Sequence, residues 1–411
     1  MKLVIYNLLI LMLVPIFALR ILFKSLADKD YRNNFPSRLG FNLRPIIRNK
    51  DKLIWFHAVS LGEVIGSQDI IRQLIQKYDV VITTSTPTGL RKARKLFQDE
   101  ATIDYAPWDF LGFINRFFNF YKPDAVIIFE TEIWPSMISQ SAKKNIPFYL
   151  VNGRLSKKSY QAYAMSAWLM KDALQKITFA FVQTEKHKER FLKLGINQKN
   201  IQVAGSVKFD APGLKAESLQ MSPFILGAST HPGEDEMLLD AFKKLLKTEG
   251  LKLCICPRHP ERSSKIINQA TSMGLSAKLY SKLSSQDFDV CIVDSIGELP
   301  GFYLSAVMAF VGGSLVPRGG HNLIEPAVLG TPIIIGPHTF NFEDIVSKFL
   351  QDEACIEVTN GDELTVAMQM LLDAPEKAQQ LSEKAQRVVA KNKGSTEIQA
   401  SYIINKIGEM H

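Results

Sequence analysis

The stretch VGGSLVPRGGHNLIEPAVLGTPIIIGPHTFNF, Val311–Phe342, decides the fold class. The apolar run Ala306–Val311 leads into it and predicts a buried strand, and Ile333–Ile335 predicts a second strand. Between them, a basic, glycine-rich turn is followed by a short helix, which we expect to begin at Asn322 and to end before Gly330. A strand, loop, helix and strand in this order are typical of an α/β protein with a parallel sheet.

The same stretch carries the strongest candidate ligand site of the chain. Its turn contains four glycines, Gly312, Gly313, Gly319 and Gly320. Without Cβ atoms, these positions should let a ligand approach the backbone, and the helix start adds positive backbone N–H groups. Glu325, one turn into the helix, is placed to accept hydrogen bonds from a ribose diol. The alternative is that Asn322 and Glu325 form only a capping box. His321 on the same loop favours a nucleotide site.

Composition indicates a folded protein of two domains with an anionic partner. The chain has 411 residues, of which 46% are hydrophobic and 22% charged, as in ordinary α/β proteins. A net charge of +8 points to phosphates or an anionic lipid surface. Nucleic acid is not expected, because zinc-finger spacing, RNP-like segments and basic zippers are missing from the sequence. No metal site is expected, and the four cysteines are interpreted as reduced thiols of a cytosolic domain.

The N-terminal segment predicts membrane association. Leu3–Phe23 is almost wholly apolar, which is marginally long enough for a spanning helix. Basic residues follow the segment from Lys24 onward, so the body of the protein is expected on the cytoplasmic side. A helix lying in the membrane interface is the alternative to a spanning helix.

Strands and helices alternate along the rest of the chain. Short apolar runs predict parallel strands at Leu53–His57, Val80–Thr84, Ala125–Phe129, Phe148–Val151 and Phe179–Gln183, and again at Phe224–Ala228, Leu251–Cys256, Val290–Val293, Ala306–Val311, Ile333–Ile335 and Cys355–Val358. Helical patterns cover Val64–Lys77, Gly89–Gln98, Glu185–Leu194 and Pro375–Glu409.

This alternation predicts two successive doubly wound α/β domains with a ligand cleft between them. We expect a membrane anchor at residues 1–23, an N-terminal domain at residues 24–205 and a linker at residues 206–222. A C-terminal domain that includes the final helices should then cover residues 223–411.

Polar motifs follow several of the predicted strands, where parallel sheets bind ligands. HAVSLGE places Glu63 after the first strand, where it could act as a general base on a hydroxyl or merely favour the dipole of its helix. ETEIWP places Glu130 and Glu132 after a later strand, and their alternation predicts that only one faces the cleft. His57 is the rival base to Glu63, although we expect its ring to pack or hydrogen-bond locally.

Two further motifs carry basic residues. GSVKFD places Lys208 at the expected domain junction, where it is either solvated or reaches a charge held between the domains. CPRHPER places Arg258 after a strand of the second domain. Its guanidinium is a natural fork for phosphate or carboxylate, although a surface arginine is the default interpretation. DSIGELP, Asp294–Pro300, is a further strand-to-helix turn.

Together, the motifs resemble a known family. HAVSLGE, TTSTPTG, ETEIWP, NGRLS, GSVKFD, ASTHPGE, PRHPER, GELP and FVGGSLVPRGGHNLIEPA, in this order and spacing, are similar to the bacterial 3-deoxy-D-manno-octulosonic acid (Kdo) transferases of lipopolysaccharide synthesis. The resemblance implies a GT-B fold and inverting transfer of Kdo from CMP-Kdo onto the lipid A precursor. It also implies an anchor in the inner membrane, with the catalytic domains on its anionic cytoplasmic face.

The resemblance also implies roles for particular residues. Glu63 would be the proton acceptor, and Glu130 and Lys208 would support the transition state. The CMP-contacting positions would be Pro257, Arg258, Ile296, Gly297, Glu298, Asn322, Leu323, Ile324 and Glu325. Because CMP leaves as an anion that basic groups can stabilise, neither a metal nor another cofactor is expected.

One feature departs from the family pattern, and two other functions compete with transfer. The departure is the basic helix start Arg91, Lys92, Arg94 and Lys95, which could be a solvated face.

A nucleotide-sugar 2-epimerase of the same fold would need neither a lipid acceptor nor an anchor. A non-catalytic nucleotide-sugar sensor at the membrane would keep Asn322 and Glu325 but would have no use for Glu63.

Overall fold

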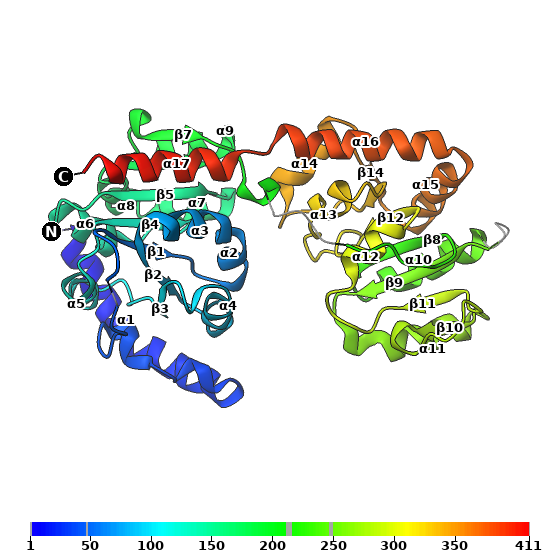
Figure 1. The fold of residues 1–411 in the computed structure, drawn as a ribbon, viewed down its shortest axis with the longest axis horizontal. Coiled ribbons are helices and arrows are strands. Elements are labelled where there is room, and N and C mark those ends of the chain that lie inside the picture. Colours follow the sequence, from blue (N-terminus) through cyan, green and yellow to red (C-terminus); the bar gives the residue numbers. More distant parts are fainter. Residues whose placement is uncertain (1, 47, 211–215, 246–249, 411) are drawn as a thin grey trace. The chain divides into compact units, whose positions relative to one another are not determined.

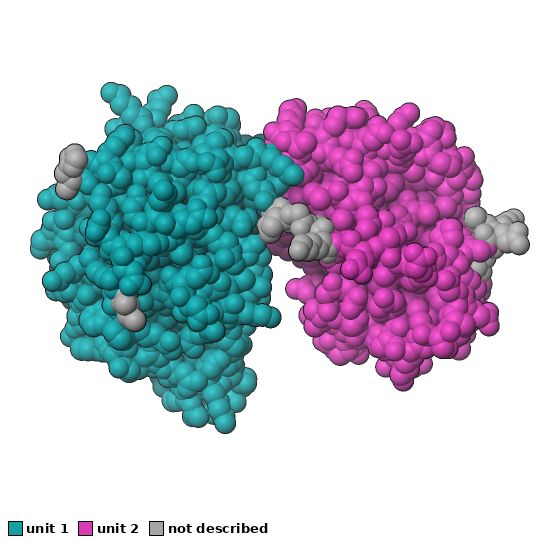
Figure 2. Space-filling view, in the orientation of Figure 1, with its two compact units in different colours: residues 1–210, 393–411 teal, residues 211–392 magenta. Residues whose placement is uncertain are grey.

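The computed structural model describes residues 2–46, 48–210, 216–245 and 250–410. The chain forms two compact units, which Figure 2 shows in different colours. Unit 1 comprises residues 1–210 and 393–411, and unit 2 comprises residues 211–392. Residues 211–215 of the expected linker lie outside the described residues.

Unit 1 is built on a parallel sheet of seven strands in the order β3-β2-β1-β4-β5-β6-β7 (Figure 1). The strands are β1 (Leu53–His57), β2 (Asp79–Thr84), β3 (Thr102–Tyr105), β4 (Ala125–Phe129), β5 (Phe148–Gly153), β6 (Phe179–Val182) and β7 (Ile201–Val203). The chain passes from β1 to β2 on one side and later returns to β4 on the other side of β1. The carboxyl ends of β1 and β4 are therefore the topological switch point, where open α/β sheets bind ligands.

Helices cover both faces of this sheet, so each central strand is buried on both faces. The helices are α2 (Leu61–Gly66), α3 (Gln68–Lys77), α4 (Pro87–Phe97), α5 (Leu111–Tyr121), α6 (Pro135–Lys143), α7 (Lys157–Met165), α8 (Ala167–Leu174), α9 (Glu185–Leu194) and α17 (Ser395–Gly408), with short 3-10 turns η1 (Lys29–Tyr31), η2 (Phe35–Leu39), η3 (Gln198–Asn200) and η4 (Val207–Asp210). Successive residues of β1 enter different cores, since Trp55 packs with Phe117 on one face and Phe56 packs with Phe129 on the other. This alternation explains why β1 is an uninterrupted apolar run.

Unit 2 repeats the architecture with strand order β10-β11-β9-β8-β12-β13-β14, again all parallel. The strands are β8 (Phe224–Thr230), β9 (Lys252–Pro257), β10 (Ala277–Leu279), β11 (Val290–Ile292), β12 (Met308–Val311), β13 (Ile333–Ile335) and β14 (Ile356–Glu357). The helices are α10 (Glu234–Leu245), α11 (Ser263–Ser272), α12 (Leu299–Ser305), α13 (Ile324–Val328), α14 (Glu343–Gln351), α15 (Gly361–Asp373) and α16 (Pro375–Lys391), with turns η5 (Pro260–Arg262) and η6 (Tyr280–Lys282). The switch point of this sheet lies between β8 and β12. The predicted class, two doubly wound α/β units, is confirmed.

The first helix, α1 (Lys2–Ala27), is long and apolar enough to cross a membrane. Its best window has a mean hydropathy of 2.3, and only 6% of that window is buried within the protein. Two polar side chains nevertheless tie its first turns to unit 1. The Tyr6 hydroxyl donates to Asp109 Oδ2 over 2.9 Å, and the Asn7 amide donates to Ser136 Oγ over 3.1 Å. Asn7, which interrupts the apolar segment in the sequence, is thus a buried tether between the helix and the folded unit.

The last helices correct one expectation about the domains. We expected a continuous helical stretch over Pro375–Glu409 inside the C-terminal domain. Instead, Gly394 takes a left-handed φ of +98° between α16 and α17, and α17 packs on α3 of unit 1. The Gln399 side chain also accepts a hydrogen bond of 2.7 Å from the backbone N–H of Asn152. The sequence pattern of α17 is amphipathic, and nothing local to it says which sheet its apolar face covers.

Candidate active site

Glu63 occupies the first turn of α2, directly after the carboxyl end of β1. Its Oε2 accepts the backbone N–H of Val59 over 2.8 Å, and its Oε1 accepts the Ser60 hydroxyl over 3.2 Å. These two bonds orient the half-buried carboxylate within its own motif, HAVSLGE. The position at the switch point is the one predicted from the sequence.

The surroundings of Glu63 favour its protonated form. Burial raises the pKa of its carboxyl to about 8, and the negative charges of Glu130 and Glu132 contribute further, against the lowering effect of the Val59 N–H. A carboxyl with a pKa near working pH is suited to exchange a proton with a hydroxyl. Such perturbed groups in sheet-edge sites are candidates for catalysis.

Glu130 follows β4 and has a left-handed φ of +60°. Residues other than glycine and asparagine rarely adopt this backbone conformation. A strained residue of this kind at a switch point is a reason to suspect function. The Asn152 amide lies 3.5 Å from Glu130 Oε1. The Oδ1 of Asn152 accepts the backbone N–H of Val207, which precedes Lys208 in η4. Buried Asn152 therefore connects the segments of two of the three predicted catalytic residues.

Both carboxylates of ETEIWP raise the pKa of Glu63 through their charge, although only one of them was expected to face the cleft. The expectation assumed an extended chain, whereas the left-handed Glu130 turns the backbone. Glu132 accepts a 2.6 Å hydrogen bond from the Trp134 indole, and burial raises the pKa of its carboxyl.

His57, the rival base, is fully buried. Its Nδ1 bonds Thr83 Oγ1 over 2.9 Å, and its ring meets the Trp134 ring edge-on at 4.7 Å. Burial lowers the pKa of the imidazole to about 4. This local packing is as expected, and it leaves His57 no route to a substrate hydroxyl.

In unit 2, the loop after β12 is held by a residue that the sequence analysis passed over. Glu234, fully buried at the start of α10, accepts four backbone N–H groups: His231 at 2.9 Å, Gly313 at 2.7 Å, Ser314 at 2.9 Å and Leu315 at 3.0 Å. One carboxylate thus ties the loop after β8 to the loop after β12. Glu234 could be seen in the motif ASTHPGE, three residues after His231. No sequence rule, however, identifies its hydrogen-bond partners in the loop after β12, about 80 residues away.

Two glycines of the β12 loop, Gly312 and Gly313, are required by the packing of the loop itself. A Cβ on Gly312 would lie 2.7 Å from the Ser229 carbonyl oxygen and 2.8 Å from Thr230 Cα. At Gly313, with a φ of +69°, it would crowd the His321 and His231 rings. At these two positions, the close approach of the protein's own atoms is enough to require glycine.

The helix start expected at Asn322 begins two residues later, at Ile324 of α13. The Asn322 Oδ1 accepts the Ile324 N–H over 3.1 Å, but the residue that precedes α13 is Leu323, whose side chain makes no capping bond, so this contact is not the expected capping box. Glu325 is half-buried, and burial raises the pKa of its carboxyl, while a hydrogen bond with the Asn322 side chain lowers it. The side chains of Leu323 and Ile324 lie in the core, so only their backbone is available to a ligand.

The other predicted donor residues lie at the same carboxyl edge of the sheet. Pro257 ends β9 and Arg258 follows it, with its backbone N–H bonded to Thr230 O over 3.0 Å and its side chain exposed. Ile296 is 89% exposed and Gly297 has a φ of +102°, in the loop between β11 and α12 that ends at Glu298. All these segments follow β9, β11 or β12. Because the strands are parallel, their carboxyl ends lie along the same side of the sheet.

A histidine pair lies beside this edge, next to the β12 loop. His231 Nε2 lies 3.3 Å from His321 Nε2, and the two rings are stacked. Burial, with the nearby charges of His231 and Arg258, lowers the pKa of His321 to about 4, so the pair is neutral at pH 7. In the described part of the chain, no group of three or more His, Cys, Asp or Glu side chains is arranged to hold a metal ion.

Two doubly wound units, each with polar side chains at its switch point, define the GT-B class of glycosyltransferase fold. A glycosyltransferase structure from Rickettsia africae matches with a TM-score of 0.60 at 15% identity, over 88% of this chain and 100% of that one. UDP-GlcNAc 2-epimerase from Neisseria meningitidis matches with a TM-score of 0.59 at 16% identity, over 86% and 99%. At these identities, the likeness concerns the fold alone.

Sequence comparison defines the family. The family model described as 3-deoxy-D-manno-octulosonic-acid transferase (kdotransferase) matches residues 33–211. The 3-deoxy-D-manno-octulosonic acid transferase of Haemophilus influenzae is 33% identical over 407 residues, covering 95% of each chain. The Bordetella pertussis transferase is 31% identical over 366 residues, covering 84% of this chain and 85% of the other. The chain belongs to the family of Kdo transferases, and the predicted resemblance and glycosyltransferase activity are confirmed.

Proposed function

We propose that this protein transfers Kdo from CMP-Kdo onto the lipid A precursor with inversion, with Glu63 as the general base. The observation that carries the proposal is the Glu63 carboxyl at the β1/β4 switch point, with its pKa raised to about 8 beside Glu130 and Glu132. A non-catalytic sensor has no use for such a group. A 2-epimerase would also need a base, to move the proton at C2, so what stands against it is the family to which the chain belongs.

The reaction that these residues would perform is a single displacement. The acceptor hydroxyl oxygen forms a bond to the anomeric carbon of Kdo while the bond from that carbon to the CMP phosphate oxygen breaks. The proton of the hydroxyl passes to Glu63, and CMP departs with the bonding electron pair. Glu130 and Lys208 are proposed to support the charge that develops in the transition state.

We assign the donor to unit 2. Glu325 would accept hydrogen bonds from the ribose hydroxyls, and Arg258 would pair with the phosphate. Pro257, the segment Ile296–Glu298 and the backbone of Asn322–Ile324 would complete the CMP site. Because the base and the donor segments belong to different units, transfer requires both. We propose that no metal is needed, since CMP leaves as an anion that arginine and lysine side chains can stabilise.

We further propose that α1 holds the enzyme on the inner membrane with its catalytic units on the cytoplasmic face. The support is the apolar length of α1 and the basic residues that follow it in the sequence. A membrane-bound enzyme meets a lipid acceptor without extracting it from the bilayer.

The test of the base is Glu63→Gln, which keeps the shape of the side chain but removes its basicity. We expect transfer to fall by roughly 10²–10⁴-fold, the usual contribution of general acid–base catalysis, with CMP affinity unchanged. In the wild-type enzyme, kcat/KM should rise with pH up to about 8, since only ionised Glu63 accepts a proton. Transfer is measured with purified full-length enzyme, CMP-Kdo and lipid acceptor in detergent.

Glu185→Gln is the matched control for this substitution. Glu185 is also a first-turn glutamate of a unit 1 helix, but its exposed side chain lies after β6 rather than at the switch point. It should retain full transfer. If Glu63→Gln also transfers Kdo at nearly the normal rate, Glu63 is only a helix-terminal charge and the proposal fails.

A further inference from the structure

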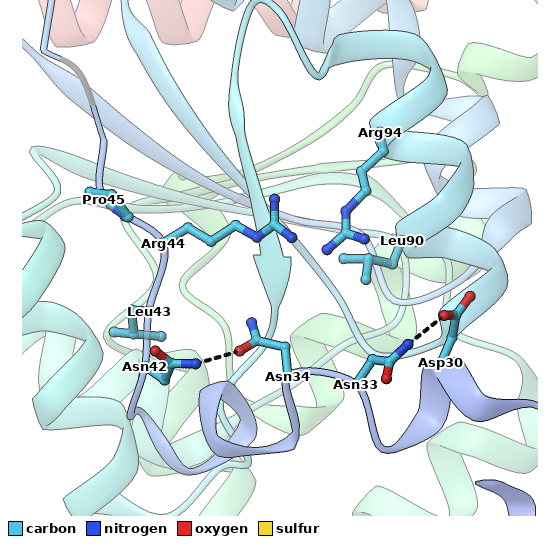
Figure 3. Close-up of a pocket in the computed structure, with 9 residues that line it drawn as sticks. All are labelled: Asp30, Asn33, Asn34, Asn42, Leu43, Arg44, Pro45, Leu90 and Arg94. Atoms are coloured by element: carbon cyan, nitrogen blue, oxygen red, sulfur yellow. Dashed lines mark hydrogen bonds between the residues drawn. The ribbon is translucent and has the colours of Figure 1, made fainter.

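A pocket of about 460 Å³ lies in unit 1, and none of the proposed catalytic residues lines it (Figure 3). Three segments surround it. Asp30, Asn33 and Asn34 come just after α1, the loop 42–45 forms a second side, and Leu90 and Arg94 of α4 form the third. Arg94 belongs to the basic run of Arg91, Lys92, Arg94 and Lys95, which was expected at a helix start, but α4 begins at Pro87 and Arg94 lies in its last turn.

Two guanidinium groups dominate the pocket. Arg44 and Arg94 enter from opposite sides and point toward one another (Figure 3). Burial lowers the pKa of Arg94, and the positive charge of Arg44 lowers it further. Arg94 Nε is buried with no hydrogen-bond partner among the described residues. Arg44 is exposed, and an anion between the two guanidiniums would relieve the repulsion between their charges.

The carboxylates near the pocket are already engaged by other groups. Asp30 forms an ion pair with Arg91. Asp104, which is 1% exposed, accepts the Asn34 amide over 2.7 Å and the backbone N–H of Arg44 over 3.2 Å. Both carboxylates attract Arg94 at longer range, but among the described ion pairs neither is joined to it. Asp104 also interacts with the charge of Arg44, but among the described contacts no carboxylate is hydrogen-bonded to either guanidinium, so both can donate to a ligand.

Asparagines fix the floor of the pocket. Asn34 and Asn42 both have left-handed backbones, with φ of +55° and +49°, a conformation that asparagine tolerates better than most residues. The Asn42 amide donates to Asn34 Oδ1 over 3.3 Å, and the Asn34 amide donates to Asp104. Each amide nitrogen keeps a second hydrogen, so the floor offers neutral donors below the two arginines.

We infer that this pocket binds a phosphate group between Arg44 and Arg94. A planar guanidinium donates two parallel hydrogen bonds to phosphate oxygens, and two facing guanidiniums match its two negative charges. At about 460 Å³, the pocket has room for a phosphate together with part of the group that carries it. Asp30 follows the end of α1, at Ala27, by three residues. A phosphate on a membrane lipid headgroup is thus one source, and free inorganic phosphate is the other.

The test measures binding of two probes to full-length protein in neutral detergent micelles at constant ionic strength. One probe is inorganic phosphate, and the other is phosphatidic acid mixed into the micelles, with phosphatidylcholine as the blank. We expect Arg44→Gln/Arg94→Gln to weaken binding of whichever probe the wild type takes at least tenfold, as measured by calorimetry. Binding of phosphatidic acid alone assigns the site to a lipid phosphate, and equal binding of inorganic phosphate assigns it to free phosphate.

Arg32→Gln/Lys95→Gln is the matched control, because it removes the same charge from exposed neighbours that do not line the pocket. It should bind within about twofold of the wild type, as long-range attraction between exposed charges is screened by salt. If the Gln pair fails to fold, Arg44→Lys/Arg94→Lys keeps the charge but loses the forked geometry, and it should bind several-fold more weakly. The inference is overturned if neither probe binds the wild type, or if pocket and control variants bind equally.

Discussion

At the scale of single residues, burial is the main reason that the carboxyl groups of Glu63 and Glu132 have raised pKa values. Glu63 could be picked from the sequence because it follows an apolar strand by six residues, a local pattern. Its raised pKa could not, because it comes first from burial in the packed protein and then from the charges of Glu130 and Glu132, which follow β4 some 70 residues later. The same limit hid Asn152 and Glu234, whose hydrogen bonds join segments far apart in the chain.

The buried carboxyl of Glu63 should make the enzyme less stable as pH rises. Its folded pKa of about 8 lies above the ordinary value of 4.5, so the folded state holds the proton more tightly than the unfolded state. Its contribution to stability is present below pH 4.5 and is lost as pH rises to about 8. Glu63→Gln carries no such charge, so its Tm should increasingly exceed that of the wild type between pH 5 and 8.5. Parallel thermal melts of the two proteins that differ by a constant amount across this range would contradict the assignment.

At the scale of elements, the sequence predicts the central strands well and the edges poorly. The apolar strands β1, β4 and β13 have the predicted bounds, because they are buried on both faces. The edge strands β3, β7 and β10 were missed, since they are short and half polar. The helix expected at Val64–Lys77 is divided at Ser67, whose buried hydroxyl donates to the Glu63 carbonyl oxygen over 2.7 Å. That interruption was not visible in the spacing of apolar residues.

Glu234 of α10 is predicted to be the residue that holds the loops after β8 and β12 in place. In Glu234→Gln, one of its two oxygens becomes an NH2 group that faces backbone N–H donors, so those donors lose their acceptor. The cost of burying unsatisfied donors is about 1–3 kcal/mol, which lowers the Tm of a unit of this size by about 2–4 °C per kcal/mol. Calorimetric melts should show the lower Tm, and the affinity for CMP should fall because the loops after β8 and β12 are no longer held in place.

Glu236→Gln serves as the control, since Glu236 lies in the same turn of α10 and its side chain is exposed. It should leave both measurements within error. Equal melts for the two variants would mean that the four hydrogen bonds of Glu234 contribute no net stability.

At the scale of the whole molecule, the two-unit architecture follows from the pattern of strands, but the path of the chain does not. The restart of the strand pattern after Gly205 predicts two sheets. The return of residues 393–411 to unit 1 depends on which apolar groove α17 fills, and that is a property of packed surfaces. Likewise, the composition of α1 predicts membrane association, whereas its docking through Tyr6 and Asn7 depends on Asp109 and Ser136 of unit 1.

This docking decides how the membrane role of α1 should be tested. Deleting residues 1–23 would remove the apolar surface together with the hydrogen bonds of Tyr6 and Asn7, so released protein could simply be damaged. The exposed side chains Leu9, Met12 and Ile16 are 54%, 72% and 58% accessible and share one face of the helix. Replacing all three with asparagine removes about 1.5–3 kcal/mol of apolar burial per side chain but keeps the tether.

We expect Leu9→Asn/Met12→Asn/Ile16→Asn to move the enzyme from vesicles to the soluble fraction in high salt, with transfer to detergent-dispersed acceptor retained. High salt is used because it suppresses residual attraction between basic residues and anionic lipid. Val366→Asn/Ile398→Asn removes exposed apolar side chains outside α1 and should stay with the vesicles. If the triple variant still sediments with vesicles in high salt while the enzyme remains active, another apolar surface anchors it and α1 is not required for membrane binding.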